Sequence, residues 1–295
     1  MTPKLYGELR SGMIWRRILI LSPHPDDEVV GAAAAILRAG AAGVSVFVLH
    51  LTTGIPAQDV LWPWDRRGHA RRVAHRRAEA FQAANALGVE IVGCCDRPSR
   101  TLWTDLPGAR RDVVAVVARL SIDRLWVPAY EGGHSDHDAA NGLASTFRNT
   151  AEVWEFAEYN FCGGRITANA FPDRRGSEVD LALTPEEAGR KSDLLRLYAS
   201  EQGNLAHAGV TRECFRPLAD HDYGQPPHPG PLFYQRYHWL WFRHPRVDFT
   251  TTPEVCAAVT ALRAVYANAP TPDPMPAPGG RSPAPEPRAP DPASA

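Results

Sequence analysis

The stretch RRILILSPHPDDEVVGAAAAILRAG, residues 16–40, decides the fold. Its apolar run 18–21 is continuous, which is typical of a strand covered on both faces. A helix is predicted from Asp27 to Ala39, because the residues there are mainly alanine and aliphatic and Gly40 supplies a stop. Between the two elements lie one histidine, His24, and three consecutive carboxylates, residues 26–28. The stretch therefore predicts a buried strand that ends in polar residues.

The alternation of strand and helix continues through the first half of the chain. Further strands are predicted at 44–49, 90–92, 125–127 and 153–156, and helices at 65–87, 110–120 and 136–149. Strands that alternate with helices of this length imply right-handed crossovers and a mainly parallel sheet. We therefore predict an α/β fold.

The second half is less regular. A helix is predicted to begin at Thr184, which suits an N-cap because Pro185 and Glu187 follow at the first and third helical positions. Residues 231–240 suggest an edge or antiparallel strand. We predict a single domain over 16–268 and a disordered, proline-rich tail over 269–295, because the tail is almost free of large apolar residues.

Composition limits the function classes. The apolar share is 44%, the charged share 22% and the formal charge −1, so nothing suggests a polyanion partner. The arginines of 66–77 are interpreted as a solvated helix face rather than a nucleic-acid site. Five cysteines without a CxxC pair favour a reducing compartment. With no signal-peptide core at the N-terminus and no long apolar run, we expect a cytoplasmic protein without a membrane span.

A second polar cluster follows the predicted strand 125–127. It reads EGGHSDHD, residues 131–138. Ligands of open α/β sheets bind beyond the carboxyl ends of the strands, so both clusters are predicted to lie at one edge. The first contains an HxxD spacing and the second an HxxH spacing. Two histidines and one carboxylate satisfy the ligand pattern of a catalytic zinc site, and the remaining groups are then free to move protons.

These motifs resemble those of the PIG-L/LmbE-like zinc-dependent N-acetylglucosaminyl deacetylases. The resemblance is carried by SPHPDDE and HSDHDAAN, and by the segments FVLHLTTG, RRAEAFQAANALGV, KSDLLRLYASEQ and QPPHPGPLFYQ. It spans roughly residues 17–242. It implies a Rossmann-like fold, with helices on both faces of the sheet, and one zinc ion.

The resemblance also implies roles for individual residues. The zinc ligands would be His24, Asp27 and His137. Asp26 would be the general base, and His134 would polarise the carbonyl or protonate the leaving amine.

Three further residues are candidates for the site. Asp136 is expected to act in catalysis as the partner of a histidine in its loop. Arg76 and His228 are expected to contact substrate, although a structural arginine that pairs with Glu79 and a surface histidine are alternative interpretations.

The chain departs from the family pattern at two positions. Ser135 replaces the usual proline between the paired residues. Some members carry a tyrosine two residues before the histidine that matches His134, and that position is Gly132 here, with Tyr130 two residues further back.

The expected function is metal-dependent removal of an acetyl group from an N-acetylglucosamine-type sugar or glycoconjugate. One alternative is an amidase acting on a thiol-sugar conjugate or another small amide. An alternative of another class is a Rossmann-like binding module with structural zinc. A nucleotide-binding protein is disfavoured because SPHPDD stands where GxGxxG would lie. Imidazole and carboxylate accept both zinc and iron, so the sequence leaves the metal open.

Overall fold

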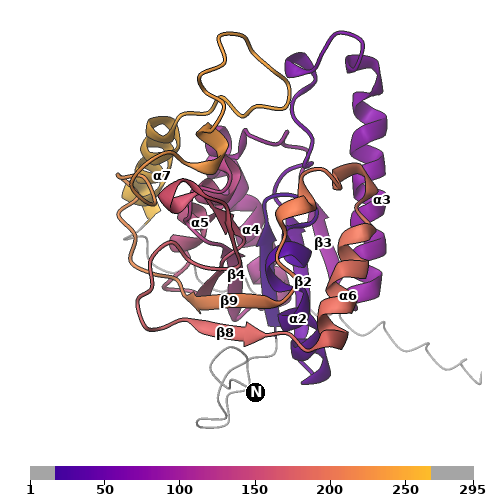
Figure 1. The fold of residues 1–295 in the computed structure, drawn as a ribbon. Coiled ribbons are helices and arrows are strands. Elements are labelled where there is room, and N and C mark those ends of the chain that lie inside the picture. The colour runs from indigo at the N-terminus through magenta and orange to yellow at the C-terminus, as the bar shows by residue number, and fades with distance from the viewer. Residues whose placement is uncertain (1–16, 267–295) are drawn as a thin grey trace, which may run out of the picture.

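A seven-stranded sheet forms the centre of the computed structural model, which describes residues 17–266 (Figure 1). The strand order is β3-β2-β1-β4-β5-β9-β8. Five strands are parallel, namely β1 (Arg17–Ser22), β2 (Ser45–His50), β3 (Glu90–Cys94), β4 (Arg124–Pro128) and β5 (Glu152–Phe156). The remaining two strands join by antiparallel pairing: β9 (Arg212–Pro217) pairs with β5, and β8 (Val179–Ala182) pairs with β9. The predicted α/β fold with a mainly parallel sheet is confirmed.

Helices cover both faces of this sheet (Figure 1). One face carries α2 (Asp27–Ala41), α3 (His69–Leu87) and α6 (Pro185–Arg196), and the other carries α4 (Leu106–Leu120), α5 (Ser135–Ser145) and α7 (Thr252–Tyr266). Ile18 and Ile20 of β1 pack in the first layer, whereas Leu19 and Leu21 pack in the second. The apolar run of β1 is continuous because alternate side chains enter two different cores.

Several element boundaries follow from capping. Helix α4 begins at Leu106, four residues before the predicted start, because the Asp105 side chain accepts a hydrogen bond from the Gly108 N–H. The predicted cap at Thr184 is confirmed: its hydroxyl accepts from the Glu187 N–H, and the Glu187 carboxylate accepts from the Thr184 N–H.

Residues 231–240 do not form the predicted strand. They contain only the short helix η7 (Phe233–Gln235) and turns. The aromatic side chains here are not arranged as one buried face: Phe233 contacts the ring of Tyr159, and Trp239 is exposed. Strands β8 and β9 supply the antiparallel edge instead, and helix α7 was not predicted.

Short elements complete the described chain. Strands β6 (Tyr159–Asn160) and β7 (Thr167–Ala168) form a separate antiparallel pair. The other 3-10 helices are η1 (Gln58–Val60), η2 (Arg66–Gly68), η3 (Leu102–Asp105), η4 (Cys162–Gly164), η5 (Ala199–Glu201) and η6 (Leu205–His207). None of the helices described between residues 17 and 266 combines the length and apolarity needed to cross a membrane. The predicted tail, 269–295, lies outside the described residues.

The strand order locates the functional edge. Strand β1 lies between β2 and β4, so the chain adds β2 and β3 on one side of β1 and then β4 and β5 on the other side. In open α/β sheets the ligand crevice lies outside the carboxyl ends of the strands at this switch point. The two polar clusters follow β1 and β4, the two strands that flank the switch point.

Candidate active site

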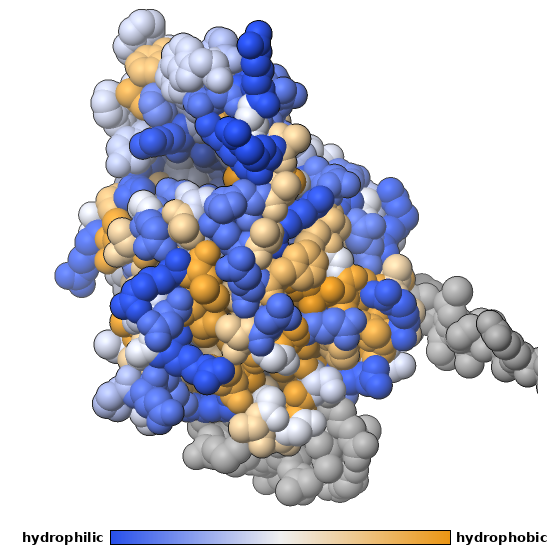
Figure 2. Space-filling model, turned by 90° about the vertical axis from the view of Figure 1, so that its right-hand side faces the viewer, coloured by the Kyte–Doolittle hydropathy of each residue, from blue (hydrophilic) through white to orange (hydrophobic). Residues whose placement is uncertain are grey.

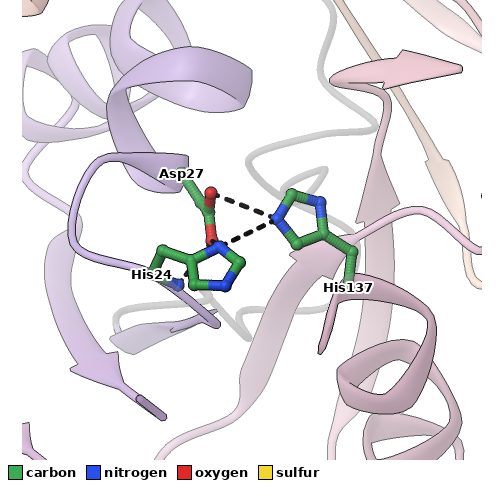
Figure 3. Close-up of side chains that lie close together, drawn as sticks. All are labelled: His24, Asp27 and His137. Atoms are coloured by element: carbon green, nitrogen blue, oxygen red, sulfur yellow. Dashed lines mark hydrogen bonds and ion pairs between the residues drawn. The ribbon is translucent and has the colours of Figure 1, made fainter. Parts of the chain in front are cut away.

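Three side chains from the two clusters converge beyond β1 and β4 (Figure 3). The His24 Nδ1 atom lies 3.2 Å from His137 Nε2 and 3.5 Å from Asp27 Oδ2. His137 Nε2 lies 3.3 Å from Asp27 Oδ1. All three side chains are buried. Residues separated by 110 positions in sequence thus present their ligand atoms to one point.

This donor set fits a small divalent cation. Ligand atoms about 2.0–2.2 Å from a tetrahedral zinc ion lie about 3.3–3.6 Å from one another, close to the observed separations of 3.2, 3.3 and 3.5 Å. The electrostatics agree: although burial lowers it, the carboxylates of Asp27 and Asp136 raise the pKa of His24 to about 10. The carboxylates of Asp27 and Asp136 therefore favour positive charge at His24.

Asp136 orients His24. Its Oδ2 atom lies 3.0 Å from His24 Nε2, and its carboxylate accepts the backbone N–H groups of Arg100 and Leu102. With Nε2–H donated to Asp136, the lone pair of His24 Nδ1 faces His137 and Asp27. A second group of possible ligands, His24, His134 and Asp136, is geometrically close, but these backbone contacts already occupy the Asp136 oxygens.

The pairing of Asp136 differs from the expected one. A histidine of its own loop was the predicted partner, whereas the structure pairs it with His24 of the other cluster. His134 Nδ1 is 3.8 Å from Asp136 Oδ2, beyond hydrogen-bond distance. Burial raises the pKa of Asp136, but the hydrogen bond from His24 outweighs this and leaves it at about 2. Asp136 is thus a charged acceptor for His24.

Asp26 lies beside the convergent side chains and is bound by Arg76. Its Oδ2 atom is 2.7 Å from Arg76 Nη2, and its backbone φ of 151° is rare for a residue with a side chain. Burial raises the pKa of Asp26 to about 7, against the lowering effect of the Arg76 charge. Such a carboxyl group is suited to proton transfer near neutral pH.

Arg76, an expected substrate contact, is 2% exposed. Its guanidinium bridges Asp26 and Glu201, with Nη1 3.1 Å from Glu201 Oε1, and lies over the Tyr198 ring. It does not pair with Glu79, which accepts hydrogen bonds from Ser200 instead. Arg76 is therefore a buried partner of the Asp26 carboxylate.

His134 caps helix α5 with its ring. Its Nδ1 atom accepts the Asp136 N–H at 3.0 Å, so the ring proton of the neutral form resides on Nε2. Burial and the neighbouring His24 hold its pKa well below the usual range. The ring lies 4.4 Å from that of His24, centroid to centroid. His134 is therefore placed as a neutral donor beside the convergent site.

His228 borders the loop that carries His134. Its Nδ1 atom lies 2.9 Å from the Pro229 carbonyl, and its buried Nε2 has no partner among the described residues. A Cβ atom built on Gly132 would lie 3.3 Å from this nitrogen. His228 is thus close to the loop, although no contact joins it to the convergent side chains. Tyr130 points elsewhere, since its hydroxyl donates to the Gln225 carbonyl.

The third carboxylate of the first cluster, Glu28, has a structural role. It accepts hydrogen bonds from Ser22 and Tyr198 and lies 3.4 Å from His50 Nε2. These contacts tie the start of α2 to the ends of β1 and β2. Two of the three consecutive carboxylates therefore face the site and one holds the backbone around it.

Two residues next to the site were not predicted from the sequence. Ser99 Oγ lies 3.2 Å from His24 Nε2, and Glu158 Oε2 lies 3.9 Å from His137 Nδ1. Both Glu158 oxygens are buried without a hydrogen-bond partner in the described part of the chain. A signal for Glu158 was present, because it follows β5 at the same edge of the sheet. Ser99 lies in a loop after β3 and carries no such signal.

Fold and site together define a Rossmann-like α/β protein with a His–His–Asp group suited to a metal ion at the switch point of its sheet. Residues 19–147 match the PIG-L family, whose description is GlcNAc-PI de-N-acetylase. This stretch holds both polar clusters, and the match confirms the resemblance to the PIG-L/LmbE-like proteins that the motifs predicted.

Relatives of the chain carry related names. A 1D-myo-inositol 2-acetamido-2-deoxy-alpha-D-glucopyranoside deacetylase 2 of Catenulispora acidiphila is 30% identical over 156 residues, 45% of this chain and 51% of the relative. The diacetylchitobiose deacetylase of Thermococcus kodakarensis is 29% identical over 137 residues, 43% of this chain and 47% of the relative. The chain thus spans only about half the length of these relatives.

Solved structures share the fold. A triple mutant of a deacetylase of the teicoplanin biosynthetic pathway has a TM-score of 0.55 at 22% identity, and covers 68% of this chain and 97% of its own. The A40926 pseudoaglycone deacetylase Dbv21 has a TM-score of 0.51 at 21% identity, and covers 70% of this chain and all of its own. Identity this low supports the fold alone.

Proposed function

We propose that the chain is a zinc-dependent hydrolase that removes an acetyl group from an N-acetylglucosamine-type sugar or glycoconjugate. The observation that carries the proposal is the convergence of His24, Asp27 and His137 next to two proton-handling side chains, Asp26 and His134. The names of the relatives support the same reaction class. We also infer that residues 16–268 act as one domain, because both helix layers pack on a single sheet.

His24, Asp27 and His137 would hold the ion, and the three ligands leave a further coordination position for water or substrate. When bound, zinc acidifies water and polarises a carbonyl group. Asp136 would keep the His24 Nδ1 lone pair directed at the ion, because its carboxylate accepts a hydrogen bond from His24 Nε2–H.

Asp26 accepts the proton of the attacking water in this proposal. Arg76 holds one carboxylate oxygen, Oδ2, so the carboxylate has a fixed direction. A carboxylate with a pKa near 7 accepts a proton from water and returns it to the departing amine with little loss in either step.

His134 stabilises the negative charge that develops on the amide oxygen. Because its Nδ1 accepts a backbone N–H, its Nε2–H is the group available for donation. A neutral imidazole serves this role without being protonated, so the low pKa of His134 is compatible with the reaction. We therefore propose that Asp26, rather than His134, donates the proton to the leaving amine.

The side of the site near His137 is aromatic. The Tyr159 ring lies 5.8 Å from that of His137 and contacts the rings of His207 and Phe233. Aromatic faces stack on the apolar faces of sugar rings, which supports a sugar substrate. We also propose that His228, which lies next to Gly132, contacts the substrate.

The test is acetate release from a panel of amides by the purified full chain. The panel contains N-acetylglucosamine, its glycosides, diacetylchitobiose and an amide of a thiol-sugar. We expect release from the acetylated sugars, loss of release after chelation, and recovery with zinc. Recovery with iron(II) but not with zinc would correct the metal, and hydrolysis of the thiol-sugar amide alone would replace the substrate.

Asp26→Asn separates this reaction from a structural metal site. The variant is expected to bind zinc with unchanged stoichiometry while its turnover falls about a hundredfold or more. Glu28→Gln is not a suitable control, because the Glu28 side chain supports the backbone around the site. The control is Glu90→Gln, at the exposed start of β3. Near wild-type turnover in Asp26→Asn would refute the assigned base.

A further inference from the structure

Exposed large apolar side chains are concentrated in two segments that lie close together. We call residues 60–64 and 237–242 the aromatic rim. Among the described residues, six of the large hydrophobic side chains that are exposed belong to it, namely Val60, Trp64, Tyr237, Trp239, Trp241 and Phe242. The exposed fractions of Trp241, Trp239 and Trp64 are 91%, 75% and 74%. Side chains this exposed project from the surface and do not line a groove.

Ring contacts join the two segments. The Trp62 ring stacks on that of Trp64 at 5.4 Å and meets the edge of His244 at 5.7 Å, and His244 contacts Phe242 at 6.1 Å. In Figure 1 the two loops rise at the top of the view, purple before α3 and orange before α7. This is the end of the molecule at which the parallel strands finish.

The segments that carry the rim are cationic although the chain as a whole is not. Residues 58–72 and 236–247 contain seven arginines and two aspartates, whereas the formal charge of the whole chain is −1. One aspartate, Asp65, is paired with Arg72. Figure 2 shows deep-blue side chains beside pale ones on the projection at the top of the molecule.

The base of the rim is fastened to the candidate site. The Arg100 guanidinium donates to the carbonyls of Pro245 and Val247, and the Arg100 N–H donates to Asp136. The Ser135 hydroxyl donates to Asp248 at 2.5 Å. The rim therefore stands beside the same edge of the sheet as the His–His–Asp group.

We propose that the aromatic rim binds the surface of an anionic lipid bilayer. Tryptophan and tyrosine are the side chains that favour the boundary between headgroups and acyl chains, because an apolar ring is joined to a polar atom. Arginine adds attraction to lipid phosphates. A convex surface that combines both kinds of side chain suits a flat bilayer better than a folded ligand, and it directs the edge with the site toward the headgroups.

Vesicle binding by the full chain tests the proposal without use of any activity. Sedimentation with vesicles of phosphatidylcholine and phosphatidylglycerol is compared with sedimentation with phosphatidylcholine alone. We expect stronger binding to the mixed vesicles, weakening with added salt, and a blue shift of tryptophan emission on binding.

The variants locate the surface. The double variant Trp239→Ser/Trp241→Ser is expected to lose affinity for the mixed vesicles by about tenfold or more, because two large rings are removed from the interface. Arg243→Gln/Arg246→Gln should reduce the preference for the anionic lipid. The matched control is Phe81→Ser, whose side chain is 51% exposed on α3, and it should bind as the wild type does. Circular dichroism verifies that each variant is folded.

Three results would overturn the proposal. They are no sedimentation of the wild type with mixed vesicles, binding that is unchanged in Trp239→Ser/Trp241→Ser, and an equal loss in Phe81→Ser. Light scattering gives the oligomeric state of each protein. If the wild type were an oligomer and the double variant a monomer, and neither bound vesicles, the rim would be an interface between two copies of the chain instead.

Discussion

The guanidinium of Arg76 and the carboxylate of Asp26 form an ion pair inside the protein, with Nη2 and Oδ2 2.7 Å apart. The pair joins helix α3 to the start of α2 at the functional edge of the sheet. Since burial raises the pKa of Asp26 and the Arg76 cation lowers it, the arginine determines how far this carboxyl group remains ionised.

Removing the cation should shift the pH dependence of catalysis. In Arg76→Met the pKa of Asp26 rises, so more alkali is needed to ionise the base. We expect the acidic limb of the kcat/KM profile to move up by about one pH unit or more. Arg76→Lys keeps a cation beside Asp26 and should show little of the shift, and Arg77→Met, a neighbour that pairs with Asp96, should leave the limb in place. A lower rate with an unmoved limb would mean that Arg76 acts on the fold only.

Asp136 should govern metal affinity rather than chemistry. Asp136→Asn removes the charge that orients His24 and one of the oxygens that hold Arg100 and Leu102. Metal sites that lose such a partner lose about 10–100-fold in affinity. Competition with a chromogenic chelator measures the zinc Kd, and Asp193→Asn on the exposed surface of α6 is the control. An unchanged Kd would contradict the role.

Local sequence patterns sufficed for the parallel part of the fold. The apolar run of β1 reports burial on both faces, and polar residues at the ends of β1 and β4 meet because carboxyl ends of parallel strands share one edge. The convergence of His24 with His137 follows from topology alone. For the same reason Glu158, after β5, could have been foreseen.

Other features depend on packing that a sequence does not encode locally. Asp136 binds His24 because the Arg100 loop delivers two backbone N–H groups to its carboxylate. Arg76 reaches Asp26 because α3 packs beside α2. The aromatic run 231–240 resembles a strand in composition, yet its rings contact neighbouring loops. The pattern of apolar residues there therefore did not indicate a strand.

The buried pair of Glu155 and Arg216 should make stability depend on pH in acid. The Glu155 carboxylate lies 2.6 Å from Arg216 Nε and 2.9 Å from His221 Nε2. Burial raises its pKa, but His221 and Arg216 outweigh this and lower it from 4.5 to about 2. The pair therefore stabilises the fold fully above pH 4.5, and its contribution is lost as the pH falls through about 2.

Glu155→Gln removes the carboxylate that Arg216 Nε and His221 share, and leaves the buried Arg216 charge only its contacts with Asp173 and Glu178. We expect the free energy of unfolding at neutral pH to fall by about 3–5 kcal/mol, and the difference from wild type to narrow below pH 4.5. Denaturant titrations at several pH values measure both effects. Glu90→Gln, at the exposed start of β3, should unfold as the wild type does. A difference that stayed constant down to pH 2 would exclude titration of Glu155 as its cause.

The loop before His134 should tolerate no side chain at Gly133. A Cβ atom there would lie 2.4 Å from the backbone oxygen of Tyr159, a separation that forces one of the two segments to move. Because His134 is the next residue, Gly133→Ala should lower kcat/KM about tenfold or more through misplacement of its ring. The matched variant is Gly189→Ala inside α6, where a Cβ atom meets nothing within 4 Å and should raise stability by about 0.5–1 kcal/mol. Full activity in Gly133→Ala would show that the His134 ring is not held by this close approach, and the donor assigned to the amide oxygen would then need another anchor.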